Sequence, residues 1–104
     1  MIQFDYDINT ELPKNIKYCF IAITKEAINN TLNHSNATKM HIVIQEHPAF
    51  YQLLLQDNGT NNSKHLSDGI GIQNMKDRVK ILNGTMQISN ENGFKILVSV
   101  FKFN

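Results

Sequence analysis

A long amphipathic segment, residues 12–34, constrains the fold of this chain more than any other feature of its sequence. Its apolar side recurs at steps of three and four residues, as on one side of an α-helix, through Ile16, Phe20, Ile23, Ala27 and Thr31. Pro13 suits the first turn of a helix, and Thr10 is a candidate for its cap. A second helical spacing, over residues 71–82, ends at Asn83-Gly84, a pair that favours a left-handed stop.

Strand-like segments stand around these two helices. Residues 2–8 alternate apolar and polar side chains, which is the period of a half-buried strand. His47-Pro48 predicts a tight antiparallel turn, and Asn92-Gly93 predicts a hairpin. The pattern predicts strands near residues 2–8, 38–46, 50–57, 85–91 and 94–102. We therefore expect one domain over residues 1–104, an α/β two-layer sandwich with a mixed sheet of about five strands covered on one face by helices.

Composition excludes several classes of protein. The formal net charge is +1, so binding to nucleic acid or to a membrane surface through bulk charge is not expected. The single cysteine, Cys19, cannot form an internal disulfide, fits a reducing compartment, and is expected to be a small buried side chain. We expect no signal peptide, since Met1 leads directly into the alternating segment, and no membrane span, since no apolar run approaches the required length. We expect a cytoplasmic domain, with any membrane anchor in another part of a longer parent protein.

The first of three polar clusters lies on the long helix. Glu26, Asn30 and Asn33 are four and three residues apart, so they share a narrow stripe beside the apolar side. A carboxylate and a carboxamide on one stripe can hold a hydrated Mg²⁺, which takes oxygen ligands and keeps several waters. A solvated helix edge would give the same pattern.

The second cluster is Asp57-Asn58-Gly59, at the end of a predicted strand. By two-residue alternation Asp57 shares a face with Leu53 and Leu55. If that face is buried, the carboxylate needs a donor to offset its desolvation, and the amine of an adenine would serve. A turn that simply ends the strand is the alternative.

The third cluster is the Gly69-Ile70-Gly71 segment, directly before the second helix. Glycines let the backbone approach an anion, and a helix N-terminus offers free N–H groups, so this segment could cradle phosphates. Glycines before a helix also often only form a turn. The segment matches neither the dinucleotide fingerprint nor the Walker loop, because it lacks a third glycine and a Lys-Ser/Thr pair.

Taken in this order, the three clusters resemble the N box and the two glycine boxes of the Bergerat-fold ATPases. The strings EAINNTLNHSNATKMHIVI, DNG and GIGIQNMKDRVKILNGTMQI are most similar to the two-component sensor histidine kinases, and within them to the short-lidded subfamily of nitrate sensors. The resemblance covers about residues 12–100. It implies a Bergerat fold, ATP and Mg²⁺ as ligands, and residues 60–68 as a short ATP lid.

The resemblance also implies roles for individual residues. Asn30 would coordinate Mg²⁺, and Glu26 would polarise the attacking group. Asp57 would accept a hydrogen bond from the adenine amine while Gly59 lets the chain pass the base. The phosphates would lie beside the Gly69-Ile70-Gly71 segment.

The chain departs from the family pattern at three positions. Asn61 stands where a second glycine is usual, although Asn tolerates a left-handed backbone. Asn33 replaces a common Lys, and His34, Lys64 or His65 could supply the missing positive charge. Phe94 follows Gly93 where the family often has a Thr near the adenine, which puts one adenine contact in doubt.

The resemblance implies a function that depends on partners. The γ-phosphoryl of ATP would pass to a histidine on a separate dimerisation domain, and from there, indirectly, to a response regulator. A nucleotide-sensing module without chemistry, or a serine kinase of the anti-sigma-factor type, would use the same boxes. No nucleic acid or membrane contact is expected from this segment.

Overall fold

Five strands and two helices make up the computed structural model, which describes residues 1–60, 70–90 and 93–102. In chain order they are β1 (Ile2–Asp7), α1 (Lys14–His34), β2 (Met40–Glu46), β3 (Phe50–Asp57), α3 (Ile70–Ile81), β4 (Thr85–Ser89) and β5 (Lys95–Phe101). Each predicted element is present, with ends that differ from the prediction by no more than a few residues.

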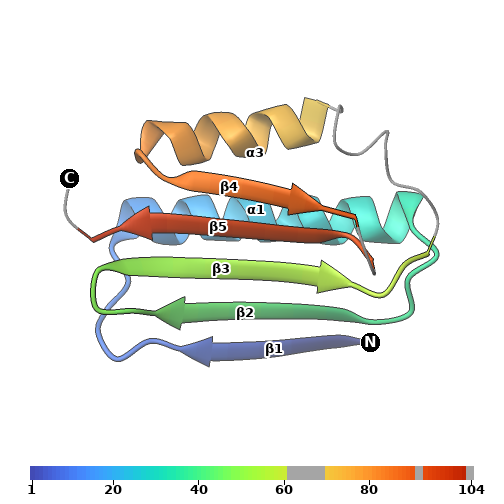
Figure 1. The fold of residues 1–104 in the computed structure, drawn as a ribbon, viewed down its shortest axis with the longest axis horizontal. Coiled ribbons are helices and arrows are strands. Elements are labelled where there is room, and N and C mark those ends of the chain that lie inside the picture. Colours follow the sequence, from blue (N-terminus) through green and yellow to red (C-terminus); the bar gives the residue numbers. More distant parts are fainter. Residues whose placement is uncertain (61–69, 91–92, 103–104) are drawn as a thin grey trace.

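The strands form one mixed sheet in the order β1-β2-β3-β5-β4 (Figure 1). β1 runs parallel to β2, and the other neighbouring pairs are antiparallel. Parallel neighbours need a crossover, and α1 provides it between β1 and β2. The predicted turn at His47-Pro48 joins β2 to β3, where the His47 N–H donates to the Phe50 carbonyl at 2.8 Å.

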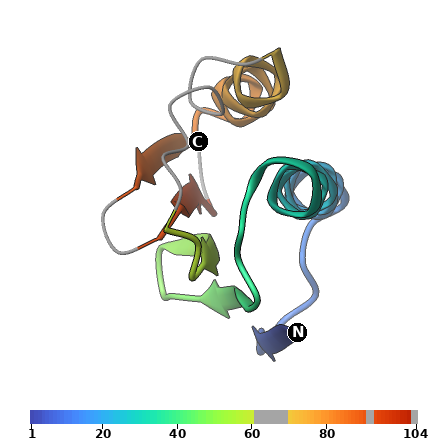
Figure 2. The same cartoon turned by 90° about the vertical axis from the view of Figure 1, so that its right-hand side faces the viewer.

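Both helices lie on the same side of the sheet (Figure 2). The core between the layers takes its largest fully buried side chains from α1, α3 and the three central strands: Phe20, Ile23, Ile42, Leu53, Leu55, Ile72, Met75, Val79, Ile96, Val98 and Val100. Burial of this apolar surface is the main force that holds the layers together. The predicted two-layer sandwich is confirmed.

The helix ends agree with the prediction at one terminus and differ at another. Asn83, after α3, has a left-handed φ of 56°, and the Gly84 N–H donates to the Val79 carbonyl at 2.9 Å, so the predicted stop is confirmed. The prediction of Thr10 as the cap of α1 is wrong. The residue before the helix is Pro13, whose side chain has no group that can cap it. The Thr10 hydroxyl lies three residues earlier and donates to the Glu46 carboxylate of the sheet instead.

Strand β1 alternates as predicted, but its apolar side is not buried. Ile2, Phe4 and Tyr6 pair with the buried Met40, Ile42 and Ile44 of β2, yet they remain 51, 53 and 56% exposed. The reason is position in the sheet: β1 is an edge strand, and Figure 2 shows it beyond the layer that α1 covers. A repeat of two residues reports which side chains share a face, not whether another layer covers that face.

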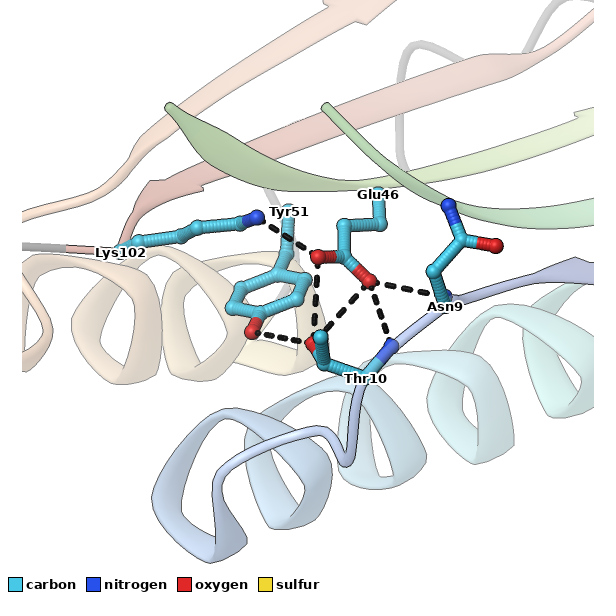
Figure 3. A network of polar contacts seen from close by, with 5 residues as sticks. All are labelled: Asn9, Thr10, Glu46, Tyr51 and Lys102. Carbon is cyan, nitrogen blue, oxygen red and sulfur yellow. Dashed lines mark hydrogen bonds and ion pairs between the residues drawn. The ribbon is translucent and has the colours of Figure 1, made fainter. Parts of the chain in front are cut away.

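A polar network ties the loop between β1 and α1 (the N-terminal loop) and Lys102, directly after β5, to the sheet (Figure 3). The Glu46 carboxylate accepts hydrogen bonds from the N–H groups of Asn9 and Thr10 at 2.8 and 3.0 Å and forms an ion pair with Lys102 at 2.6 Å. The side chain of Glu46 is 7% exposed, and the Lys102 ammonium lies 5.2 Å from the centre of the Tyr51 ring. The network joins three segments that are distant in sequence.

Candidate functional site

Asp57, the last residue of β3, is a buried charged residue, with 5% exposure. It shares the helix-facing side of β3 with Leu53 and Leu55, as the alternation predicted. Its Oδ1 accepts from the N–H groups of Gly59 at 2.9 Å and Phe94 at 3.1 Å. Its Oδ2 accepts from the hydroxyl of Thr31 at 3.2 Å. The residue before β5 and a residue of α1 thus both hold this carboxylate in place.

The chain after Asp57 passes close to the end of α1. A Cβ at Gly59 would stand 2.5 Å from the Ser35 hydroxyl oxygen and 3.2 Å from Asp57 Oδ1, so a side chain there would require a rearrangement. Asn36 and Thr60 exchange two hydrogen bonds, with the Thr60 N–H on Asn36 Oδ1 at 2.8 Å and Asn36 Nδ2 on the Thr60 hydroxyl at 2.9 Å. The Asp57-Asn58-Gly59 segment is therefore packed against the C-terminal end of α1.

The start of β5 closes the other side of Asp57. Gly93 has a φ of 101°, a conformation that L side chains rarely adopt, and a Cβ there would stand 2.1 Å from the Asp57 carbonyl oxygen. The Asp57 N–H donates to the Phe94 carbonyl at 2.9 Å, while the Phe94 ring is buried in the core. At this position the backbone of Phe94, not its side chain, holds the carboxylate.

The third cluster meets the first one across the helical layer. A Cβ at Gly71, in the first turn of α3, would stand 1.9 Å from Glu26 Oε1 on α1, so the half-buried carboxylate fills the space that a side chain would need. Helix α3 has no acidic residue of its own in this turn. A carboxylate beside a helix N-terminus is favoured by the positive end of the helix dipole.

The remaining residues of the first cluster differ in their exposure and in their contacts. Asn30 is half-buried, one turn after Glu26 and directly before Thr31. Asn33 is exposed, and its amide donates to Asn29 Oδ1 at 2.9 Å rather than to another member of the cluster. His34 is the last residue of α1.

Several predicted residues lie outside the described part of the chain. They are Asn61, Lys64, His65 and Gly69, with most of the expected lid over residues 60–68; for His34 and Ile70 only the backbone is described. One contact that the sequence reasoning missed is that of Thr31, which was assigned to the apolar side of the helix. A hydroxyl directly after Asn30 on a side otherwise made of Ile, Phe and Ala was the signal that could have indicated it.

Known proteins are similar to this chain in sequence and in fold. No protein-family model matches the chain. Sensor protein VraS of Staphylococcus haemolyticus is 36% identical over 80 residues, which cover 75% of this chain, and VraS of Staphylococcus aureus matches equally. The chain belongs to the ATP-binding catalytic domains of the sensor histidine kinases. This catalytic domain spans 23% of the length of those curated relatives.

Solved structures support the fold of this histidine kinase domain. Histidine kinase AdeS of Acinetobacter baumannii superposes with a TM-score of 0.72 at 19% identity, covering 99% of this chain and 55% of that one. The catalytic domain of histidine kinase ThkA gives a TM-score of 0.63 at 18% identity, covering 97% of this chain and 80% of that one. The short-lidded subfamily stays a prediction. Within the described ranges, no helix combines the length and the apolar character needed to cross a membrane.

Proposed function

We propose that this domain binds ATP with Mg²⁺ and donates the γ-phosphoryl group to a histidine on a separate dimerisation domain. The observation that carries the proposal is the hydrogen bonding of Asp57. A carboxylate has about four acceptor sites, two on each oxygen. Two backbone N–H groups take those of Oδ1, and Thr31 takes one of Oδ2. Among the described contacts, one acceptor site on Oδ2 remains for a ligand.

An exocyclic amine is the group that fits this remaining site. A carboxylate at the edge of an apolar core favours a flat ligand with a donor on its rim, because the ring can contact aliphatic side chains while the amine bonds to the oxygen. The 6-amino group of adenine meets both conditions. Asp57 would accept from it, and Gly59 would keep the neighbouring backbone close without a side chain in the way.

The phosphates would extend toward Asn30, Glu26 and the start of α3. Mg²⁺ prefers oxygen ligands, keeps several waters and often takes only one or two protein groups, so the half-buried carboxamide of Asn30 fits it. Bound there, the metal would neutralise phosphate charge during transfer. The N-terminus of α3, reached through Gly69 and Ile70, would supply N–H donors for phosphate oxygens.

Glu26 is the proposed catalytic residue of the transfer. Its carboxylate lies against Gly71, at the start of α3, and would accept a hydrogen bond from the attacking imidazole, which polarises the nucleophile. The dimerisation domain would bring that histidine, and a response regulator would receive the group afterwards. Because ATP is available in the cytoplasm, we assign the domain to that compartment.

Calorimetric titration of the domain with ATP, with and without Mg²⁺, tests the proposal. We expect weak saturable binding that Mg²⁺ strengthens, and a loss of affinity when Asp57 is replaced by Asn. This variant keeps the shape of the side chain but directs an N–H₂ group, in place of an oxygen, toward the amine. The absence of saturable binding of the unmodified domain up to millimolar ATP would contradict the proposal.

A further inference from the structure

The hydroxyl of Thr31 is the one side-chain donor to Asp57 among the described residues. Thr31 is half-buried near the C-terminal end of α1, and its Oγ1 lies 3.2 Å from Asp57 Oδ2. The other two donors are backbone N–H groups, both on Oδ1. Any orientation of Oδ2 beyond what those two bonds impose therefore comes from Thr31.

We propose that Thr31 is a positioning residue for recognition of the base, a role that rests on the proposed function of the site. Its hydroxyl occupies one acceptor site of Oδ2, which leaves the other as the place where the 6-amino group of a purine must bond. Without the hydroxyl, Oδ2 has two open sites and no donor that fixes its direction. Thr31 thus acts on the ligand through Asp57, not by direct contact with it.

The residues that lead into β5 explain why the hydroxyl that orients Asp57 comes from helix α1. The position after Gly93 is occupied by Phe94, whose ring is buried in the core and whose backbone alone reaches the carboxylate. The segment that leads into β5 thus offers no hydroxyl at this position. Helix α1 offers one instead, from a residue that the helical repeat places among Ile23 and Ala27. A hydroxyl on this apolar side is explained by its bond to a buried carboxylate.

The test compares two nucleotides that differ in one group. ATP carries the 6-amino group, and purine riboside triphosphate is the same molecule without it. We expect Thr31→Val, which removes the hydroxyl and keeps the shape, to weaken ATP binding about three- to tenfold, the usual effect of one lost hydrogen bond. Binding of purine riboside triphosphate should change less than twofold, since it makes no bond to Oδ2. Thr31→Ser should retain the affinity for ATP.

Two further variants separate recognition from stability. Thr31→Ala also removes the hydroxyl, favours the helix, and should reproduce the selective loss if Thr31→Val folds poorly. Thr24→Val makes the same replacement on α1 two turns earlier, at another half-buried threonine, and should leave both affinities unchanged. Thermal unfolding of each variant, measured alongside, reports its folded fraction.

The outcomes distinguish this inference from the proposed function. Equal losses for both nucleotides would show a general structural role, and an unchanged affinity for ATP would show no role; either overturns the inference and leaves the proposed function standing. If the unmodified domain binds neither nucleotide, the proposed function fails and the inference fails with it. If it binds both equally well, the assignment of Asp57 to the amine is wrong, and so is the role of Thr31.

Discussion

The carboxylate of Glu26 on α1 fills the space beside Gly71 on α3, where an added Cβ would stand 1.9 Å from Oε1. These residues are far apart in sequence, and their contact joins the first polar cluster to the third one. Gly71 has an ordinary helical backbone without a positive φ, so the fold does not need glycine there for its conformation. What glycine provides at this position is the space that the Glu26 carboxylate fills. The position of Glu26 therefore depends on the absence of a side chain on its neighbour.

Gly71→Ala is expected to displace Glu26 while the fold is retained. Alanine gains about 1 kcal/mol of helix propensity over glycine, and the end of a flexible Glu side chain can move away, so the melting temperature should not fall. Phosphoryl transfer by the full-length parent should fall about a hundredfold or more, as it should in Glu26→Ala, if Glu26 acts as a base. Kinetic assays of both single variants and the double variant measure this.

The double variant provides the control for that prediction. If Gly71→Ala acts only by displacing Glu26, it adds no further loss when Glu26 is already Ala. Losses that add fully in the double variant would show that Gly71 and Glu26 act independently, and the contact would then carry no catalytic meaning.

Replacing Asp57 by Ala should cost about 1.5–3 kcal/mol of ATP binding free energy, the value of a hydrogen bond to a charged group, or about ten- to a hundredfold in affinity. Asn30→Ala should weaken mainly the part of binding that depends on Mg²⁺. Calorimetric titrations with and without the metal separate the two effects. An unchanged dissociation constant in Asp57→Ala would remove the adenine assignment.

The Glu46 network should make stability depend on pH. The Lys102 ammonium and the N–H groups of Thr10 and Asn9 lower the pKa of Glu46 from 4.5 to about 2. A lowered pKa in the folded state means that the network stabilises the fold above the unfolded pKa, and that this stabilisation is lost as the pH falls toward 2. Urea unfolding of the unmodified domain and Glu46→Gln should therefore differ most above about pH 5 and converge toward pH 2.

Glu11→Gln is the matched control for the network, because Glu11 is an exposed carboxylate in the same N-terminal loop. It should alter stability little at any pH. A gap between the unmodified domain and Glu46→Gln that stays constant from neutral to strongly acid pH would contradict the role of the Glu46 charge.

Cys19 should react with thiol reagents only when the domain unfolds. Burial raises the pKa of the Cys19 thiol, and the charge of Arg78 lowers it by a smaller amount. A raised pKa reduces the fraction of reactive thiolate at any given pH, and burial also blocks access. A chromogenic disulfide reagent at mildly alkaline pH should label the single cysteine slowly in the native state and completely in guanidinium. Rapid labelling of the native domain would be the opposite result.

The isolated chain should bind ATP without labelling itself. In this family the phosphoacceptor is expected to be a histidine followed by an acidic residue, and none of His34, His41, His47 and His65 is followed by Asp or Glu. Addition of a histidine-bearing dimerisation domain should restore transfer, since only the nucleophile and its geometry are missing. Radiolabelled γ-phosphate measures both. Acid-labile label on the isolated chain would contradict this separation of the ATP site from the phosphoacceptor histidine. A full-length parent protein that binds ATP but transfers no phosphoryl group would favour a nucleotide-sensing module.

Local patterns predicted the elements well because each depends on neighbours in sequence. The three- and four-residue repeat of α1, the alternation of β3 that buries Asp57 with Leu53 and Leu55, and the stop at Asn83 all follow from helix and strand geometry alone. The three clusters could also be located in the sequence, because polar residues interrupt patterns that packing alone would fill with apolar ones, and their roles stay predictions.

Contacts between segments distant in the chain could not be predicted from the sequence. Glu46 and Lys102 are separated by 56 positions, and no local pattern pairs them, so Thr10 was assigned to a helix cap instead of to that carboxylate. The exposure of Phe4 in β1 has a similar origin. Its strand alternates like a half-buried one, and only its place at the sheet edge leaves it uncovered.

The sequence by itself determined the order of helices and strands along the chain and the residue types available for nucleotide chemistry, because these are properties of spacing and composition. The family followed from the resemblance of its motifs to those of known proteins. Only the tertiary structure decided that Glu26 lies against Gly71 and that Thr31, on a side read as apolar, donates to Asp57. The physical reason is the separation along the chain of the residues that determine each feature. Helix and strand periods are set within a few residues, whereas the packing of α1 against α3 and β3 determines which polar groups meet across the core.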